Sequence, residues 1–552
     1  MTDGPARRFT YDGWPGVARP GETLAAALAH DGFPILERSV RYHRPRAPFC
    51  GVGQCTGCLV RVNGRPNVRA CRYVPRDGDA ASTEIAWPSG RFDLLGVLDL
   101  VFPNGLDTLH GFRRPAWATR TYQRVVRRLA GYGTVPDDAA AAALAAPGET
   151  RSVEVAVIGA GTSGRAAAAR LVAAGLRPLV LDRALEAPAL PGTDRLGATT
   201  VAFLPPPEAD GRFALVAVAE PARGLLVSAR AVVVATGAYD AGLLFGSNDR
   251  PGIVTCDGAR ALTGADGRVP FERAIVVGGG ARAQEAVERW GSAVAAVVAP
   301  GEIPPELVRA ASDRGIRLYP RSLVLAANGR RRVHSLELKV RGGGARFTLA
   351  CDAVVLAHRR LPNAPLLFQA GARMHWRAGG GAYFPETDAD QATSVPGLYA
   401  VGPVAGVEPA SSAASGERAA DRIAGGGPSA EPLARVAATG VPELEGYYRE
   451  LLRAPRLGRW IACACEDVHF REVEEAHARG FRGIEVVKRY TSLGTGLCQG
   501  RYCVPDALLL LSLLEGRPAP EVGYLTQRPP TFPAPIAALA ALPPPARPPE
   551  AA

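Results

Sequence analysis

The sequence predicts an α/β protein in which a nucleotide-binding core is flanked by two small cysteine-ligand domains. Three observations predict this architecture. Two glycine-rich segments in the middle of the chain each follow an apolar strand and open a helix. Eight of the ten cysteines fall into two groups of four, one near each end. The 552 residues also exceed the roughly 250 that one hydrophobic core usually supports.

The composition is that of a globular protein, with 47% hydrophobic and 21% charged residues. The net charge is +11, but the arginines are scattered rather than gathered with aromatic residues, so we expect an acidic partner subunit and no nucleic acid. The N-terminus has no apolar signal segment, and the longest apolar run, 507–516, is about half a membrane span. We therefore expect a cytoplasmic protein without a transmembrane segment, whose thiols stay reduced.

The first cysteine group lies in residues 1–95, which we expect to form one domain with a helix over 22–32 and a hairpin over 59–71. The spacing C-x4-C-x2-C, followed by a fourth cysteine, is typical of a plant-type [2Fe–2S] cluster. Zinc is the alternative, although its sites usually use C-x2-C pairs. The expected ligands are Cys50, Cys55, Cys58 and Cys71.

A connecting arm and an alanine-rich linker (139–148) are expected over 96–150, and a dinucleotide-binding domain over 151–268 and 346–430. In its G-x-G-x-x-G motif, Gly159 permits a tight turn, Gly161 lets the backbone approach a pyrophosphate, and Gly164 lets helix and strand pack closely. Asp182 ends the following strand, where a carboxylate binds a ribose hydroxyl, and Arg183 adjoins it.

Two further segments complete this domain. A buried strand in 229–240 runs into Thr236 and Gly237, and the stretch 396–407 contains Gly402. The order of segments resembles the two-dinucleotide-domain flavoproteins of the disulfide reductase kind. In that superfamily an aspartate of the last motif binds the flavin, and here Pro403 stands in its place. The site is therefore open to FAD, NAD or ATP.

A second nucleotide domain is expected as an insertion over 269–345, with Gly278 and Gly280 in its loop. Its next strand ends VAAVVAP, with neither an acid nor an arginine at the ribose position. This loop is therefore either a working NAD site or a remnant of the fold.

The second cysteine group lies in residues 431–516, with helices expected over 471–481 and 484–491 and another after the last cysteine. The pattern resembles the bacterioferritin-associated ferredoxin (BFD) type of [2Fe–2S] domain, and zinc is again the alternative. We expect an extended or disordered proline-rich tail over 517–552, and inert, buried thiols at the two remaining cysteines, Cys256 and Cys351. The expected ligands are Cys463, Cys465, Cys498 and Cys503.

The whole chain resembles the α subunits of the sarcosine oxidase-like amine and imino-acid dehydrogenases. That group includes proline, hydroxyproline and opine dehydrogenases and hydrogen cyanide synthase. The resemblance rests on SVRYHRPRAP (39–48), VAVIGAGTSG, ATGAYD, NDRPGIVT (248–255) and KRYTSLGTGLCQGRYC (488–503).

The resemblance implies an electron-transfer, nucleotide-binding subunit of a hetero-oligomer, with two [2Fe–2S] clusters and no catalytic residue on this chain. A D-amino-acid-oxidase-like β subunit with FAD would oxidise a secondary amine or amino acid, FMN would lie at the interface, and electrons would pass to a quinone-reducing partner. Two alternatives stay open: a self-contained NAD(P)H:acceptor reductase, and a zinc-stabilised scaffold.

Overall fold

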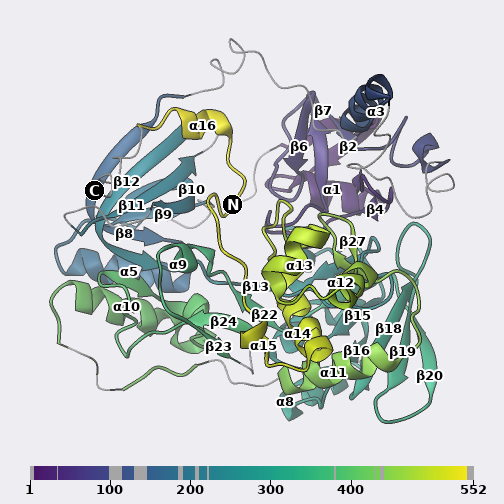
Figure 1. Ribbon diagram of the computed structural model, residues 1–552. Coiled ribbons are helices and arrows are strands. Elements are labelled where there is room, and N and C mark those ends of the chain that lie inside the picture. Colours follow the sequence, from purple (N-terminus) through teal and green to yellow (C-terminus); the bar gives the residue numbers. More distant parts are fainter. Residues whose placement is uncertain are drawn as a thin grey trace. The chain divides into compact units, whose positions relative to one another are not determined.

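The computed structural model divides into two compact units, each assembled from distant parts of the chain (Figure 1). Unit 1 comprises Met1–Thr134, Asp240–Arg359 and Gly440–Leu525, and unit 2 comprises Val135–Tyr239, Arg360–Thr439 and Thr526–Ala552. The structure describes residues 5–33, 35–97, 115–129, 146–183, 190–204, 211–219, 223–377, 381–427, 429, 431–435 and 441–543.

The N-terminal part of unit 1 is a five-stranded sheet, in the order β2-β1-β7-β5-β6, packed against helix α1. The predicted helix and hairpin are confirmed. Thr23 caps α1 by accepting from the Ala26 amide, and Asn63 and Gly64 take positive φ in the hairpin turn. The elements are β1 Arg7–Tyr11, β2 Trp14–Ala18, α1 Leu24–His30, β3 Glu37–Arg38, β4 Pro45–Arg46, β5 Leu59–Val62, β6 Arg65–Arg69, β7 Asp79–Thr83, η1 Leu94–Val97 and α3 Ala116–Leu129.

The middle part of unit 1 is a parallel sheet, in the order β14-β21-β15-β16-β17, followed by a three-stranded antiparallel sheet β18-β19-β20. The strand-turn-helix predicted at the second glycine-rich segment is β15 to α7. Its sheet also includes β14 and β21, which lie outside the expected bounds 269–345. The elements are β14 Ile253–Thr255, α6 Cys256–Leu262, β15 Ala274–Val277, α7 Ala281–Trp290, η2 Gly291–Ala293, β16 Val294–Val298, α8 Pro305–Ser312, β17 Arg317–Tyr319, β18 Ser322–Asn328, β19 Ser335–Val340, β20 Arg346–Ala350 and β21 Ala353–Leu356.

The C-terminal part of unit 1 is a small helical domain with a two-stranded ribbon. The three helices predicted around the second cysteine group are confirmed as α12, α13 and α14. Helix α14 is buried over its first eight residues, of which the last four are consecutive leucines. The elements are α11 Val441–Arg453, β26 Ile461–Cys463, β27 Val468–His469, α12 Phe470–Ala478, α13 Ile484–Thr491, α14 Val504–Glu515 and α15 Ala519–Val522.

Unit 2 is built on a six-stranded sheet, in the order β11-β10-β9-β8-β12-β25, whose centre is parallel. Apolar runs in β8 and β12 are buried, as expected for a parallel sheet covered on both faces. The elements are β8 Glu149–Ile158, α5 Thr162–Ala173, β9 Leu179–Asp182, β10 Asp194–Leu204, β11 Phe213–Ala219, β12 Arg223–Val234, α9 Pro365–Gln369, β23 Met374–Arg377, β24 Ala382–Pro385, β25 Leu398–Ala400, η3 Gly402–Ala405, η4 Pro409–Ser411 and α10 Ser412–Ile423. The short strands β13 (Ala238–Asp240) and β22 (Arg360–Pro362) lie where the chain passes between units.

Part of the proline-rich segment, which the structure describes as far as residue 543, packs on the sheet of unit 2. The Thr531 amide donates to the Val201 carbonyl of β10 at 2.7 Å, and Gly224 of β12 leaves room for the Ala538 carbonyl of α16 (Ile536–Ala540). Residues 544–552 and most of the expected linker, 139–145, lie outside the described residues. In the part of the chain that the structure describes, no helix combines the length and apolarity of a membrane span.

Candidate functional site

The first cysteine group forms a ring of buried thiols in unit 1. The Cys50 thiol contacts those of Cys55 and Cys71, and the Cys71 thiol also contacts that of Cys58. Backbone amides turn toward two of these sulfurs: Gln54 donates to Cys50 Sγ at 3.3 Å and Gly57 to Cys55 Sγ at 3.4 Å. We define these four residues as the first ring. Amide donors of this kind stabilise thiolate ligands.

The second cysteine group forms a closed ring of thiol contacts, which we define as the second ring. The Cys463 thiol contacts those of Cys465 and Cys503, and the Cys498 thiol contacts the same two. Hydrogen bonds from Cys463, Cys498 and Thr56 hold the pKa of Cys465 below its usual range, although burial opposes this. A thiolate, the form that binds metals, is therefore favoured at Cys465.

The residues of both rings fit a dinuclear cluster. Each ring supplies four cysteine sulfurs, which is the ligand set of a [2Fe–2S] core and also of a structural zinc ion. The C-x4-C-x2-C spacing of the first ring favours the two-iron core, because zinc sites usually use C-x2-C pairs.

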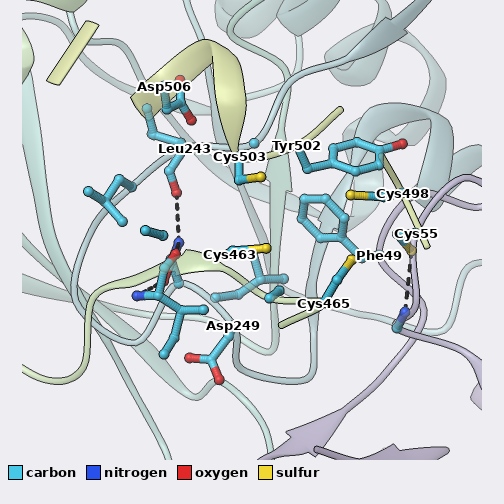
Figure 2. A pocket seen from close by; sticks show the side chains of 18 of the residues that line it. Phe49, Cys55, Leu243, Asp249, Cys463, Cys465, Cys498, Tyr502, Cys503 and Asp506 are labelled. Atoms are coloured by element: carbon cyan, nitrogen blue, oxygen red, sulfur yellow. Dashed lines mark hydrogen bonds between the residues drawn. The ribbon is translucent and has the colours of Figure 1, made fainter. Parts of the chain in front are cut away.

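The two rings lie close together. Thr56, between two first-ring cysteines, donates its hydroxyl proton to Cys465 Sγ of the second ring at 3.4 Å. Phe49 and Tyr502, which precede a cysteine of each ring, meet edge to face with ring centroids 5.3 Å apart. A cavity of about 110 Å³ has Cys55 and all four second-ring cysteines in its wall, and Figure 2 shows these sulfurs with Phe49 and Tyr502. The sequence, which separates Thr56 and Cys465 by 409 positions, carries no signal of this approach.

Buried arginines from the loop before the first ring hold the second-ring loop. Asp467 is 3% exposed and forms ion pairs with Arg44 and with Arg46, the latter at 3.4 Å. Arg46 Nη2 also donates to the carbonyls of Ala464 and Cys465, at 2.7 and 3.1 Å. Burial would raise the pKa of Asp467, but Arg44 and Arg46 hold it at about 2. Two ion pairs and two hydrogen bonds to backbone carbonyls thus fix one ring against the other.

These arginines belong to the motif SVRYHRPRAP, but their partner was missed because nothing local to Asp467 marks it. A second buried carboxyl, Glu37, pairs with Arg46 at 3.1 Å, and burial raises its pKa to about 8. On the cavity wall, burial raises the pKa of Asp506 to about 6, opposed by its ion pair with Arg359.

The first glycine loop lies in unit 2, between β8 and α5. Gly159 has φ +106°, and a Cβ there would overlap the Ala235 carbonyl. Gly161 faces open space, whereas a Cβ on Gly164 would overlap the Gly159 carbonyl. The Ala160 amide donates to the Asp182 carboxylate at 2.5 Å. This geometry leaves backbone exposed at the middle glycine, where a pyrophosphate would approach.

The other candidate residues of that domain follow two strands of its sheet: Thr236 and Gly237 come after β12, and Gly402 comes after β25. Thr236 donates its hydroxyl proton to the Asn363 carbonyl at 2.7 Å, and Gly237 takes φ +71° with open space beside it. The Gly402 amide donates to Ser415 Oγ at 2.8 Å and begins η3, which includes Pro403. The Arg183 side chain is exposed.

The second glycine loop, in unit 1, has a charged network at the start of α7. Arg282 pairs with Asp240 at 2.9 Å and with Asp257 at 2.6 Å. A Cβ on Gly278 would overlap the Ala357 carbonyl, while Gly280 faces open space. The guanidinium of Arg282 is therefore committed to protein carboxylates.

The two cysteines outside the rings are buried thiols. Burial raises the pKa of both Cys256 and Cys351 to about 12. Both residues are free of disulfide bonds. At neutral pH they are protonated and poor nucleophiles.

Comparisons with known proteins agree with this arrangement. The 2Fe-2S iron-sulfur cluster binding domain matches residues 6–85, the pyridine nucleotide-disulphide oxidoreductase family matches 207–419, and the sarcosine oxidase A3 domain matches 458–542. The chain thus contains an iron–sulfur domain and a flavoprotein-type nucleotide core, which confirms the predicted fold class.

The chain is 29% identical to the sarcosine oxidase subunit alpha of Rhizobium meliloti over 94% of its own length, and it spans 56% of that relative. It is 40% identical to the hydrogen cyanide synthase subunit HcnA of Pseudomonas aeruginosa over 15% of this chain and 74% of HcnA. The crystal structure of L-proline dehydrogenase from P. horikoshii shares the fold, with a TM-score of 0.65, 19% identity and coverage of 96% and 97% of the two chains. The resemblance predicted from the motifs is confirmed, and the chain belongs to the sarcosine oxidase-like family of oxidoreductase α subunits.

Proposed function

We propose that this chain is the electron-transfer, nucleotide-binding α subunit of a heteromeric flavin-dependent dehydrogenase or oxidase. The observation that carries the proposal is the contact between the two cysteine rings through Thr56 and Cys465. Two rings that each suit a [2Fe–2S] core, held together inside one unit, make a two-centre path for electrons. A [2Fe–2S] cluster supplies one-electron transfer when bound.

The protein's own residues account for the rest of that path. Arg44, Arg46 and the first-ring amides place positive charge and hydrogen-bond donors around thiolates that carry negative charge. Such partners stabilise a buried, negatively charged centre and tune its potential. The ion pairs of Asp467 keep the loops in register, so that the rings remain in contact.

The substrate of the complex is proposed to be a secondary amine or an amino or imino acid, of the sarcosine, proline, hydroxyproline, opine or glycine type. Its oxidation is assigned to a separate, D-amino-acid-oxidase-like β subunit with FAD. This division of labour is supported by similarity to sarcosine oxidase subunit alpha and HcnA. We expect the assembly in the cytoplasm, with electrons leaving toward a quinone-reducing partner.

The first glycine loop is proposed to bind an adenine dinucleotide or nucleotide, namely FAD, NAD or ATP. The open face of Gly161 and the position of Asp182 beside the Ala160 amide support this assignment. An FMN is proposed at an interface with the β subunit. At the second loop, Arg282 is occupied by Asp240 and Asp257, which argues against a phosphate contact from that side chain.

The test is to measure the metal and sulfide content and the electron paramagnetic resonance signals of the full chain, prepared without oxygen. We expect about four iron and four sulfide per chain, because each ring holds a two-iron core. Cys58→Ser and Cys498→Ser should each remove about half of the iron and one paramagnetic signal. Zinc in place of iron, with no signal after dithionite, would overturn the relay.

A second assay separates the relay from a self-contained reductase. NADH added to the isolated chain should leave it oxidised, and reduction should require the β subunit with an amine or imino acid. Prompt bleaching of a bound flavin by NADH alone would contradict the relay. It would indicate that the second glycine loop is a working nicotinamide site.

A further inference from the structure

We propose that Thr56 is a positioning residue that raises the reduction potential of the cluster held by the second ring. Its hydroxyl donates a hydrogen bond to Cys465 Sγ, although Thr56 itself belongs to the loop of the first ring. The inference rests on the proposed function, because it requires iron at the second ring.

The loop of the first ring leaves Thr56 little freedom. The residue is 6% exposed and follows Cys55, whose sulfur accepts from the Gly57 amide at 3.4 Å. A Cβ on Gly57 would overlap the Ala47 carbonyl, so the chain is closely packed at this turn. The Thr56 hydroxyl is therefore held where the loop places it.

Cys465 is also held in place, by contacts of its backbone and its Cβ within unit 1. Its backbone carbonyl accepts from Arg46 Nη2 at 3.1 Å, as does that of Ala464 at 2.7 Å. A Cβ on Gly496 would overlap Cys465 Cβ, which shows how closely the second-ring loop is packed. The hydrogen bond thus joins two constrained groups rather than two mobile side chains.

The expected sign follows from electrostatics. A reduced cluster is more negative than an oxidised one, so a donor aimed at a ligand sulfur stabilises the reduced state more and raises the potential. A hydroxyl supplies this bond without adding charge, which allows it to adjust the second ring while leaving the first ring's own amide donors, Gln54 and Gly57, in place.

The experiment is an anaerobic redox titration of the full chain, followed by low-temperature electron paramagnetic resonance. The two signals are assigned with Cys58→Ser and Cys498→Ser. Thr56→Val keeps the shape of the side chain without the hydroxyl, and Thr56→Ser keeps the hydroxyl. A matched control is Thr83→Val, since Thr83 is buried in the same domain and its hydroxyl bonds to the Asp12 carboxylate at 2.7 Å and to Tyr11 Oη at 3.0 Å rather than to a thiol.

We expect Thr56→Val to lower the equilibrium constant for reduction of the second-ring cluster about tenfold, which is 59 mV for a one-electron couple. In the same variant, the equilibrium constant for reduction of the first-ring cluster should change less than twofold. In Thr56→Ser and Thr83→Val, the constants of both clusters should change less than twofold. An unchanged second-ring potential in Thr56→Val would overturn the inference, while leaving the relay intact.

Two further outcomes are informative. Zinc and no signal in the unmodified chain would instead overturn the proposed function. If Thr56→Val loses its second-ring iron, Thr56→Ala provides the same comparison with a smaller side chain. Loss of that iron from both variants, with Thr56→Ser intact, would make the hydroxyl a requirement for assembly and would contradict a tuning role.

Discussion

Replacing Asp467 with asparagine should release the second-ring loop from the arginines that hold it. The side chains of Asp467 and Arg44 are 3% and 4% exposed, and Arg46 reaches the same carboxylate. The Arg41 amide donates to it as well, at 3.0 Å. The substitution keeps the shape of the side chain and removes its charge, so it leaves buried guanidinium groups without their shared counter-ion.

The free-energy cost of Asp467→Asn can be derived in two ways. The pKa of Asp467 falls from its ordinary value of 3.8 to about 2, which corresponds to about 2.5 kcal/mol of preference for the charged form. Breaking a buried ion pair by removing one partner typically costs about 3–5 kcal/mol. We therefore expect Asp467→Asn to destabilise this region by about 3 kcal/mol or more.

Peptide-resolved hydrogen exchange is the suitable assay, because a chain of two units does not unfold as one two-state system. About 3 kcal/mol corresponds to roughly hundredfold faster exchange in peptides covering 41–46 and 461–470, with unit 2 unchanged. The control is Glu474→Gln, which breaks an exposed ion pair with Arg456 in the same domain and should cost at most about 1 kcal/mol. Equal protection in Asp467→Asn and the unmodified chain would refute this account of the ring contact.

Three further predictions concern other sites. Gly258→Ala should displace the first-ring loop, because a Cβ there would overlap the Phe49 carbonyl; loss of iron from the first ring alone, measured by metal analysis and paramagnetic resonance, is the expected result, and full retention would contradict it. Burial, reinforced by Arg359, lowers the pKa of His358 to about 3 from 6.5, so the free energy of opening around this residue should fall by about 2 kcal/mol between pH 6.5 and pH 5; hydrogen exchange of peptides around residue 358, corrected for the intrinsic exchange rate, should lack this part of the pH dependence in His358→Gln, and an equal pH dependence in both proteins would count against it. Cys256 and Cys351, whose pKa burial raises to about 12, should resist iodoacetamide at pH 8 in the folded chain, and rapid alkylation seen by mass spectrometry would show that the thiols are accessible.

Local patterns in the sequence were enough to predict much of the secondary structure. Helix α13 spans the predicted residues, Ile484–Thr491, because its apolar residues recur at helical spacing. The hairpin of β5 and β6 turns at Asn63-Gly64, since both residues accept positive φ. The cysteine groups were found in the same way, from spacing alone.

The contacts between distant segments were not predictable by such means. Arg44 and Arg46 look like ordinary basic residues in a chain of net charge +11, and only the fold shows that both are buried against Asp467. The same holds for the proline-rich segment, whose composition suggested an extended or disordered tail. Its packing on β10 and β12 depends on Gly224 and Val201, which lie more than 300 positions away.

The buried charges also explain why the contact between the rings is specific. Burying an arginine is costly unless a carboxylate accepts its hydrogen bonds, and Asp467, whose pKa of about 2 keeps it ionised, is that partner for both Arg44 and Arg46. Arg46 also donates to Glu37, whose pKa of about 8 keeps that carboxyl mostly protonated at neutral pH. The remaining donors of Arg46 reach the Ala464 and Cys465 carbonyls. Apolar packing could press the two loops together in several registers, whereas these directional bonds fit one. The distance between the rings, on which electron transfer through this chain would depend, is thus set by charged groups that ligate no metal themselves.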